Sequence, residues 1–291
     1  MRRTPLALAA LTLLTAACGS LPTTRSIVSA STTHGVVADG LGHSRRLGYN
    51  FPHHRKLKAP QFGALQVTES SLPSVVDLRT TGQISPVYDQ GDLGACTAFS
   101  LGKGLRETLL RMEGQSVQSL SALYLYYKER EAEGTVNEDA GSTITTGIQV
   151  LKAHGECLDA TMPYRPESFK DKPNEAAERE AAGYEIGDYT PLNGLAELKA
   201  QLATGRPAVF GFTVYHSFMG EAIAKTGMMP MPRPKEKEEG GHAVLVVGYD
   251  DDRQVLIIKN SWGTGWGDKG YFYMPYAFVT PDRVDEMFVA R

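Results

Sequence analysis

One cysteine follows a glycine-rich turn directly, at the expected first turn of a helix. The turn spans residues 88–95 and holds two glycines, and Cys96 comes next. The N–H groups and partial positive charge of a helix N-terminus favour thiolate over thiol, and the thiolate is the nucleophile. The same N–H groups, with the side-chain amide of Gln90, could donate to an oxyanion. From this segment alone, a buried thiol in a tight turn remains the alternative.

A histidine and an asparagine lie at matching ends of two predicted strands. His242 begins an apolar run that ends at Tyr249, and a second run from Val255 ends at Asn260. An antiparallel hairpin turning near Asp251 would place His242 opposite Asn260 on one face. An amide oxygen accepting from one imidazole nitrogen would leave the other facing a nucleophile. A histidine satisfied within the core is the alternative, and the acidic turn is expected to be solvated.

Helical patterns dominate the chain up to about residue 204, and strand patterns dominate after it. Helices are predicted at 96–112, 122–132 with Ser121 as N-cap, 143–154, 174–182 and 195–204 with Asn193 as N-cap. Strands are predicted at 208–214, 242–249, 255–260, 270–274 and 286–290. This order predicts an α+β fold with two lobes and argues against alternating βαβ units.

The composition excludes several classes of protein. The 291 residues include 30 Lys+Arg and 33 Asp+Glu, a balance that argues against a nucleic-acid binder. With 42% hydrophobic and 22% charged residues, the chain has the composition of a globular protein. Three cysteines are too few for a disulfide-stapled scaffold. No apolar run reaches the roughly 20 residues that a membrane-spanning helix needs.

Residues 1–18 are typical of an export signal. Two arginines are followed by a 12-residue apolar run and by small residues before Cys18. The segment 14–18 resembles a bacterial lipobox, so we expect a lipid on Cys18 that anchors the chain to a membrane of the cell envelope. In a cell with two membranes we expect the outer one. Simple secretion is the first alternative, and an unmodified Cys18 is the second.

Residues 19–72 carry many small and polar side chains and little periodicity. We interpret them as a tether or a short pro-segment. Their histidines lack the paired spacing of metal ligands, so no metal site is expected there. The folded domain is expected at 73–291.

The motifs together resemble the papain-like cysteine peptidase family. Gln90 stands six residues before Cys96, as the family's oxyanion glutamine precedes its nucleophile. His242 precedes a strand that ends in Val-Gly-Tyr, and Asn260 opens Asn-Ser-Trp-Gly, which contains Trp262. The resemblance covers 72–291, with the motifs in the family's order.

The resemblance implies a fold and a mechanism. It implies a helical lobe packed against an antiparallel, β-barrel-like lobe, with the active-site cleft between them. Cys96 would be the nucleophile and His242 the base, Asn260 would orient the imidazole, and Gln90 would stabilise the oxyanion. We therefore expect a monomeric peptidase that hydrolyses peptide or protein substrates through a thioester acyl-enzyme, without a cofactor or metal.

Three further positions follow from the resemblance alone. Gly141, Gly241 and Trp262 are carried over as substrate-binding residues, and Trp262 would also shield the bond between histidine and asparagine. The chain departs from the family at Leu93, where many members have a disulfide cysteine. It also departs at Ala140, which replaces the first glycine of a common Gly-Gly pair.

Two alternative functions stay open. A peptide ligase or acyl transferase would use the same residues and differ in what resolves the acyl-enzyme. A non-enzymatic surface-binding module could share the fold, but it would not need all four catalytic-type residues. Cys157 is expected to be a structural thiol, since a bridge to Cys96 would destroy the nucleophile.

Overall fold

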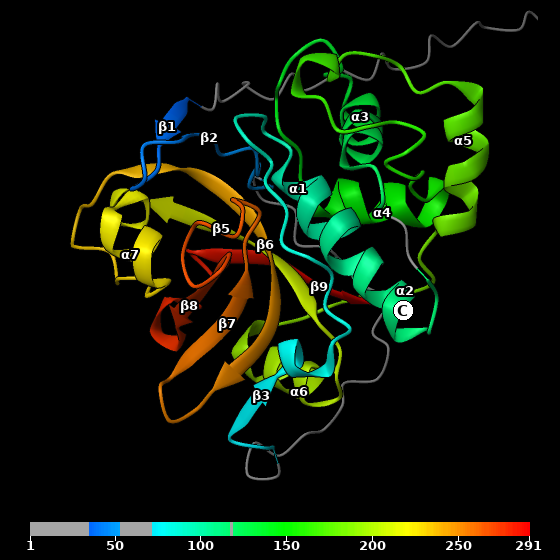
Figure 1. Ribbon diagram of the computed structural model, residues 1–291. Helices are drawn as coiled ribbons and strands as arrows, with labels where there is room; N and C mark the ends of the chain where they lie inside the picture. The colour runs from blue at the N-terminus through cyan, green and yellow to red at the C-terminus, as the bar shows by residue number, and fades with distance from the viewer. Residues whose placement is uncertain (1–34, 53–71, 117–118) are drawn as a thin grey trace, which may run out of the picture. The chain divides into compact units, whose positions relative to one another are not determined.

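The described part of the chain forms an α+β fold, as the sequence predicted (Figure 1). The computed structural model describes residues 35–52, 72–116 and 119–291. The predicted export signal, the lipidation site at Cys18 and part of the predicted tether lie outside these residues. Within the described residues, no helix combines the length and the apolar character needed to cross a membrane.

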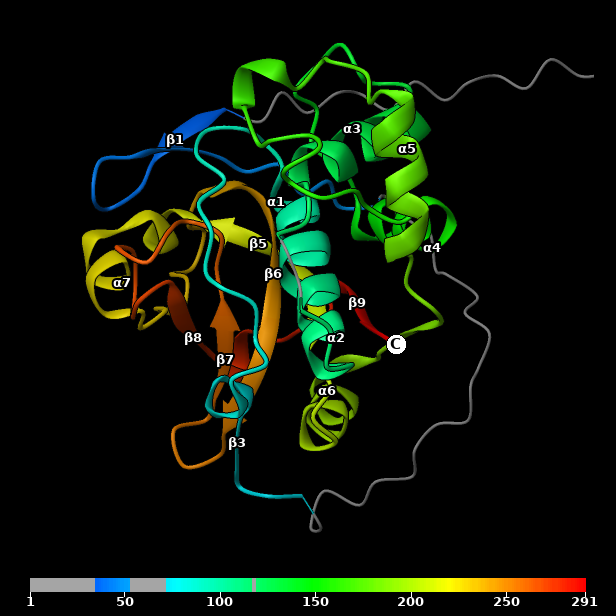
Figure 2. The ribbon, with the colours of Figure 1, turned by 45° about the vertical axis from the view of Figure 1, so that its right-hand side comes forward.

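The helices of the first half lie together on one side of the sheet (Figures 1 and 2). Their bounds are α1, Cys96–Ala98; α2, Glu107–Met112; α3, Ala122–Glu133; α4, Ile144–His154; and α5, Glu175–Ala181. A π-helical stretch over Phe99–Arg106 joins α1 to α2, so 96–112 is one continuous helix, as predicted. Two more helices accompany the strands: α6, Gly194–Ala203, and α7, Glu221–Thr226.

Helix starts follow the predicted caps with one exception. The Ser121 side chain accepts from Tyr124 N at 3.1 Å and thereby satisfies a free N–H group at the start of α3. Asn193 occupies the N-cap position of α6, but its side chain does not cap the helix. Its backbone N–H instead donates to Glu197 Oε2 at 2.8 Å, so a carboxylate one turn along takes part in the helix start.

The strands form one large antiparallel sheet. Its order is β4-β9-β5-β6-β7-β8, and β3 pairs with β6 outside this path. The bounds are β3, Val75–Asp77; β4, Tyr189–Pro191; β5, Ala208–Tyr215; β6, Glu238–Asp250; β7, Val255–Lys259; β8, Tyr271–Pro275; and β9, Val284–Ala290. The expected barrel closure is not found among the described residues, because β4 and β8 end the path without pairing to each other. A separate hairpin pairs β1, Val36–Ala38, with β2, Ser44–Arg46.

The predicted register between β6 and β7 is wrong by two residues. Leu245 pairs with Lys259, so Asn260 falls beside position 244 and not directly opposite His242. The predicted turn was centred too early: the strands end at Asp250 and resume at Val255, and the register shifts again near residue 247. Because a slip of two preserves the alternation of faces, His242 and Asn260 still share one face.

The core brings the helix 96–112 against the sheet. The helix packs on β6, and α1 also contacts α3. An aromatic group fills the sheet side beside the helix start, with Trp262 and Trp266 in an edge-to-face pair at 5.1 Å and Phe218 against both. The start of α1 is therefore held at the junction of helices and sheet, where β6 passes.

Candidate functional site

Cys96 opens α1 and is fully buried. Burial raises the pKa of its thiol to about 12, although the N–H groups of Ala243, Gly48 and Thr97 point at the sulfur and oppose this rise. Ala243, whose backbone N–H is one of these groups, directly follows His242, so the sulfur lies near the predicted base in the chain. The sequence predicted a thiolate here, whereas this closed environment favours the thiol.

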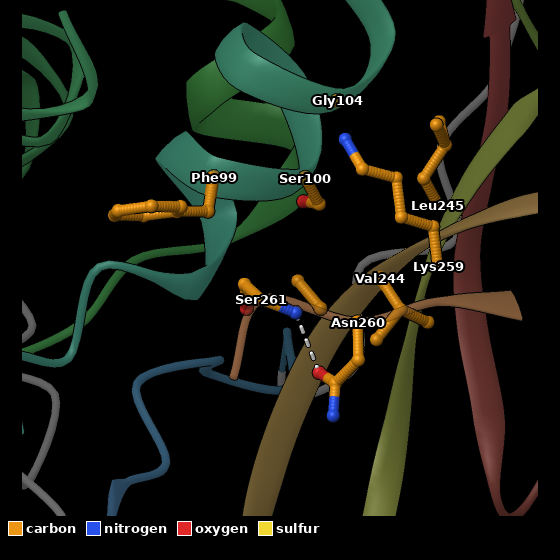
Figure 3. A pocket seen from close by; sticks show the side chains of 9 residues that line it. Phe99, Ser100, Gly104, Val244, Leu245, Lys259, Asn260 and Ser261 are labelled. Atoms are coloured by element: carbon orange, nitrogen blue, oxygen red, sulfur yellow. Dashed lines mark hydrogen bonds between the residues drawn. The ribbon is translucent and has the colours of Figure 1, made fainter. Parts of the chain in front are cut away.

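The structure brings His242 and Asn260 into direct contact. His242 Nε2 lies 2.8 Å from Asn260 Oδ1. The same oxygen accepts from Ser261 N at 2.8 Å, the bond drawn in Figure 3. An amide oxygen can only accept, so Nε2 carries the proton and Nδ1 has a free lone pair. Nδ1 has no hydrogen-bond partner among the described residues. Burial lowers the pKa of His242 to about 4, so the imidazole is neutral here.

Trp262 packs against His242, as its predicted shielding role requires. Its ring centroid lies 5.1 Å from that of His242 with the planes tilted by 34°, and the side chain is buried. Exclusion of water strengthens the hydrogen bond between His242 and Asn260, because the local dielectric is lower.

Gln90 is held with its NH2 group turned toward a carbonyl oxygen. Its Oε1 accepts from Ser261 Oγ at 2.6 Å, and its Nε2 donates to Leu93 O at 3.0 Å and to Arg46 O at 3.4 Å. A predicted oxyanion donor therefore already faces a carbonyl from the N-terminal segment. The sequence analysis missed Ser261, although its place directly after Asn260 in the motif was a signal for it.

A buried lysine ties the asparagine segment to the helix 96–112. Figure 3 shows Lys259 reaching from beside Asn260 toward the helix turn at Ser100 and Gly104. Its Nζ donates to Ser85 Oγ at 2.6 Å and to Lys103 O in the helix at 3.4 Å. Burial lowers the pKa of Lys259 to about 7. The contact fixes the end of β7 behind the site.

Residues 47–50 lie across the positions expected to bind substrate. Ser142 N donates to Gly48 O and Asn50 N donates to Ser142 O, both at 2.9 Å. Tyr49 N donates to Gly241 O at 3.1 Å. Gly141 approaches so closely that an added Cβ would lie 2.0 Å from the carbonyl oxygen of residue 48. The backbone of the segment therefore bonds on one side to Ser142, which follows Gly141, and on the other side to Gly241.

A buried arginine fastens this segment. Arg45 Nε lies 2.9 Å from Asp39 Oδ2, and its two terminal nitrogens donate to Asp89 Oδ1 at 2.5 Å and to Trp262 O at 3.2 Å. Its side chain is only 2% exposed. Because charge-assisted bonds of a buried guanidinium are costly to break, the hairpin β1–β2 is firmly attached to the loops that carry Gln90 and Asn260.

The sequence analysis missed the role of the segment 35–52. The signal available was the alternation of Leu47, Tyr49 and Phe51, a period of two that is typical of an extended chain with one buried face. Leu47 and Tyr49 are fully buried. The run was too short to stand out from the polar residues around it.

The comparisons with known proteins point to one family. A family profile described as "Papain family cysteine protease" matches residues 72–280. An uncharacterized peptidase C1-like protein of Acanthamoeba polyphaga mimivirus is 36% identical over 225 residues, which are 73% of this chain and 72% of that protein. Thiol protease aleurain of Arabidopsis thaliana is 33% identical over 219 residues, 73% of this chain and 58% of aleurain.

A solved structure extends the similarity to more of the chain. The crystal structure of xylellain, a cysteine protease from Xylella fastidiosa, is 34% identical and superposes with a TM-score of 0.76. The match covers 88% of this chain and 97% of that one. It therefore takes in more of the chain than the 72–280 of the family profile.

Proposed function

The chain belongs to the papain family of cysteine proteases, and from this premise we propose that Cys96, His242 and Asn260 hydrolyse peptide bonds through a thioester acyl-enzyme. The observation that carries the proposal is the 2.8 Å contact between His242 Nε2 and Asn260 Oδ1. It leaves Nδ1 as the basic nitrogen, and the Ala243 N–H directs the Cys96 sulfur to the adjoining residue.

The residues divide the chemistry among them. The Cys96 thiol gives its proton to His242 Nδ1, and the thiolate attacks the peptide carbonyl carbon. The displaced electron pair forms an oxyanion that the Gln90 amide and the Cys96 N–H stabilise. The imidazolium then protonates the leaving amine as the C–N bond breaks. Water, deprotonated by His242, attacks the thioester and releases the acid and the thiol.

We further infer that the segment 35–52 keeps the enzyme latent, which favours a pro-segment over a tether for this part of the chain. The N–H of Gly48 faces the sulfur, and the carbonyl oxygen of Gly48 accepts from Ser142. The nucleophile therefore meets a hydrogen-bond donor instead of an electrophilic carbon. Arg46 O lies at the Gln90 amide, so the oxyanion donor is engaged as well.

Gly48 offers a sharp test of latency. An added Cβ at residue 48 would lie 1.9 Å from Gly94 O, whereas one at Gly35 meets no atom within 4 Å. We expect full-length Gly48→Ala to hydrolyse a peptide substrate and to react with a thiol-reactive peptidyl epoxide. The matched control Gly35→Ala should stay as latent as the unaltered chain. Equal activity of the two variants would contradict latency.

The nucleophile is tested in the opened chain. Adding Cys96→Ala to Gly48→Ala should abolish hydrolysis, and adding Cys157→Ala should retain most of it, because Cys157 is a free, buried thiol on another segment. Mass mapping should place the epoxide on Cys96. Product analysis with an added amine separates hydrolysis from acyl transfer. Hydrolysis by the Cys96→Ala variant at the rate of its parent would overturn the assignment.

A further inference from the structure

The Tyr49 side chain is completely enclosed although it belongs to the covering segment. We call its surroundings the Tyr49 pocket, defined by Gly211, Gly241 and Asp285. An added Cβ at Gly211 would lie 2.0 Å from Tyr49 Cζ, and the three atoms nearest to it all belong to Tyr49. An added Cβ at Gly241 would lie 2.9 Å from Tyr49 Cδ1. The missing side chains at 211 and 241 therefore make the room that the ring occupies.

The pocket starts beside the nucleophile. Gly211 pairs with Ala243 on β6 and with Asp285 on β9, so the three positions form one row across adjacent strands and share a face. Ala243 is the residue whose N–H points at the Cys96 sulfur. A side chain that enters the row from the site thus passes Gly211 and reaches Asp285.

The far end of the pocket is polar. Tyr49 Oη donates to Asp285 Oδ1. The neighbouring Glu286 carboxylate is already engaged at the start of α4, where it accepts from Ile144 N at 2.9 Å and Thr145 N at 3.2 Å. Both carboxyl groups face the Tyr49 hydroxyl, and Asp285 is the one that is not also engaged at the start of α4.

The backbone of Tyr49 forms the hydrogen bonds that an extended peptide bound in the site would form. Its N–H donates to Gly241 O, and its two neighbours in the chain pair with Ser142, next to Gly141. Gly141 and Gly241 are the positions that the family resemblance assigns to substrate. A peptide that used the same backbone groups would direct one side chain into the Tyr49 pocket.

We propose that the Tyr49 pocket selects a tyrosine side chain of the peptide substrate, with Gly211 and Asp285 as the specificity-determining residues. This inference rests on the proposed peptidase function and narrows its substrate class. A phenylalanine would fill the same space but leave the buried Asp285 carboxylate without a partner, which disfavours it. A β-branched or larger residue at 211 would close the pocket to either ring.

The test compares peptides that differ in one side chain. Full-length Gly48→Ala is given peptides with tyrosine, phenylalanine, lysine or alanine in turn at each position within three residues of the cleaved bond. We expect tyrosine to exceed phenylalanine in kcat/KM by at least about tenfold at one position, since a site that bonds a hydroxyl rejects the analogue without it. A preference for lysine over tyrosine at that position would overturn the proposal.

Two variants of the Tyr49 pocket separate the contribution of its shape to substrate selection from the contribution of its polar end. Adding Asp285→Leu should bring the ratio of tyrosine to phenylalanine to about one or below, as the hydroxyl loses its acceptor. Adding Gly211→Ala should lower kcat/KM for both aromatic peptides by roughly tenfold or more relative to that for the alanine peptide. An unchanged ratio in Asp285→Leu overturns the role of Asp285.

The design distinguishes failure of the pocket from failure of the peptidase. If the alanine peptide is cleaved by all variants and no position prefers tyrosine, the pocket assignment falls and the proposed function stands. If no peptide is cleaved and the epoxide does not label Cys96, both fall. As a readout without added peptide, Tyr49→Phe in the otherwise unaltered chain should react faster with the epoxide than the parent, and Tyr49→Ala faster still.

Discussion

At the residue scale, burial controls the charge state of Cys96 and His242, the proposed catalytic pair. It raises the pKa of the Cys96 thiol to about 12 and lowers the pKa of His242 to about 4, so thiol and neutral imidazole coexist in the closed arrangement. Once solvent enters, the positive end of the helix and the imidazolium would favour the thiolate. Under the proposed latency, closure of the site would suppress the reactivity of Cys96 electrostatically as well as sterically.

This difference predicts a pH dependence of alkylation. Thiolate is the reactive form, so a raised pKa lowers reactivity at every pH below that value. In Gly35→Ala, which keeps the closed arrangement, iodoacetamide labelling of Cys96 should still be rising at pH 11. In Gly48→Ala it should level off below the ordinary thiol pKa of about 8.5. Coinciding pH profiles for the two variants would show that closure does not set the charge state.

The orienting amide should matter less than the nucleophile. Asn260 positions the base without transferring a proton, so Asn260→Ala in the Gly48→Ala chain should lower kcat/KM by on the order of 10- to 1000-fold. Gln90→Ala should fall in the same range. Asn174→Ala is the matched control, since Asn174 caps α5 through a 2.9 Å bond to Ala177 N and should affect stability alone. Rates unchanged in both site variants would remove these roles.

At the scale of elements, the helix 96–112 packs over a buried carboxyl group. Glu156 is fully buried, and neither of its carboxyl oxygens has a hydrogen-bond partner among the described residues. An added Cβ at Gly102, in the π-helical stretch, would lie 2.2 Å from Glu156 Oε1. Burial raises the pKa of Glu156 well above its ordinary value, so the group is held neutral under the helix.

Glu156 therefore predicts a loss of stability with rising pH. Above the ordinary pKa of about 4.5 the unfolded chain has released this proton and the folded chain retains it, so stability falls as the pH rises toward the raised value. Glu156→Gln should raise Tm at pH 8 by roughly 3 °C or more and leave it nearly unchanged at pH 4.5. The exposed Glu175→Gln on α5 is the control. Parallel pH curves for Glu156→Gln and the parent would contradict this account.

At the scale of the whole molecule, the segment 35–52 limits how far the folded domain can lie from a membrane anchor while it stays bound over the site. We propose that Cys18 carries a lipid, a site outside the described residues. Only 16 residues separate Cys18 from Gly35, a reach of at most about 55 Å when fully extended. If the segment left the site, the chain up to residue 71 would extend this limit to about 180 Å. Release would then increase both activity and range.

Detergent-phase partitioning tests the anchor. The unaltered chain, expressed with export and lipidation intact, should enter the detergent phase, and Cys18→Ala should stay in the aqueous phase, because a thioether-linked lipid supplies the apolar surface. Cys157→Ala is the matched control and should partition as the parent does. If the parent is found in the aqueous phase with Cys18→Ala, the lipoprotein proposal fails and simple secretion remains.

Local patterns were sufficient for the element types and the positions of chemical interest. These patterns are the glycine turn before Cys96, the period of its helix, and the apolar runs that begin at His242 and Val255. Each depends only on residues near one another in the chain, so the sequence predicted them without tertiary contacts. The family resemblance rested on the same short motifs. The register of β6 and β7 could not be predicted from the sequence, because the four-residue turn and the shift near residue 247 depend on how the sheet packs.

Only the tertiary structure decided which part of the chain lies over the site. Tyr49 and Asp285 are 236 residues apart, and Arg45 bonds to Trp262 across 217 residues. No periodicity encodes such pairs, since each depends on where two distant segments are placed by the folded core between them. For the same reason, the sequence shows Gly211 only as a glycine within a buried strand, and the structure shows that the Tyr49 ring occupies the space of its missing side chain. The sequence therefore determined which residues are proposed to react, and the long-range contacts decided which segment covers them and which side chain fills the space beside them.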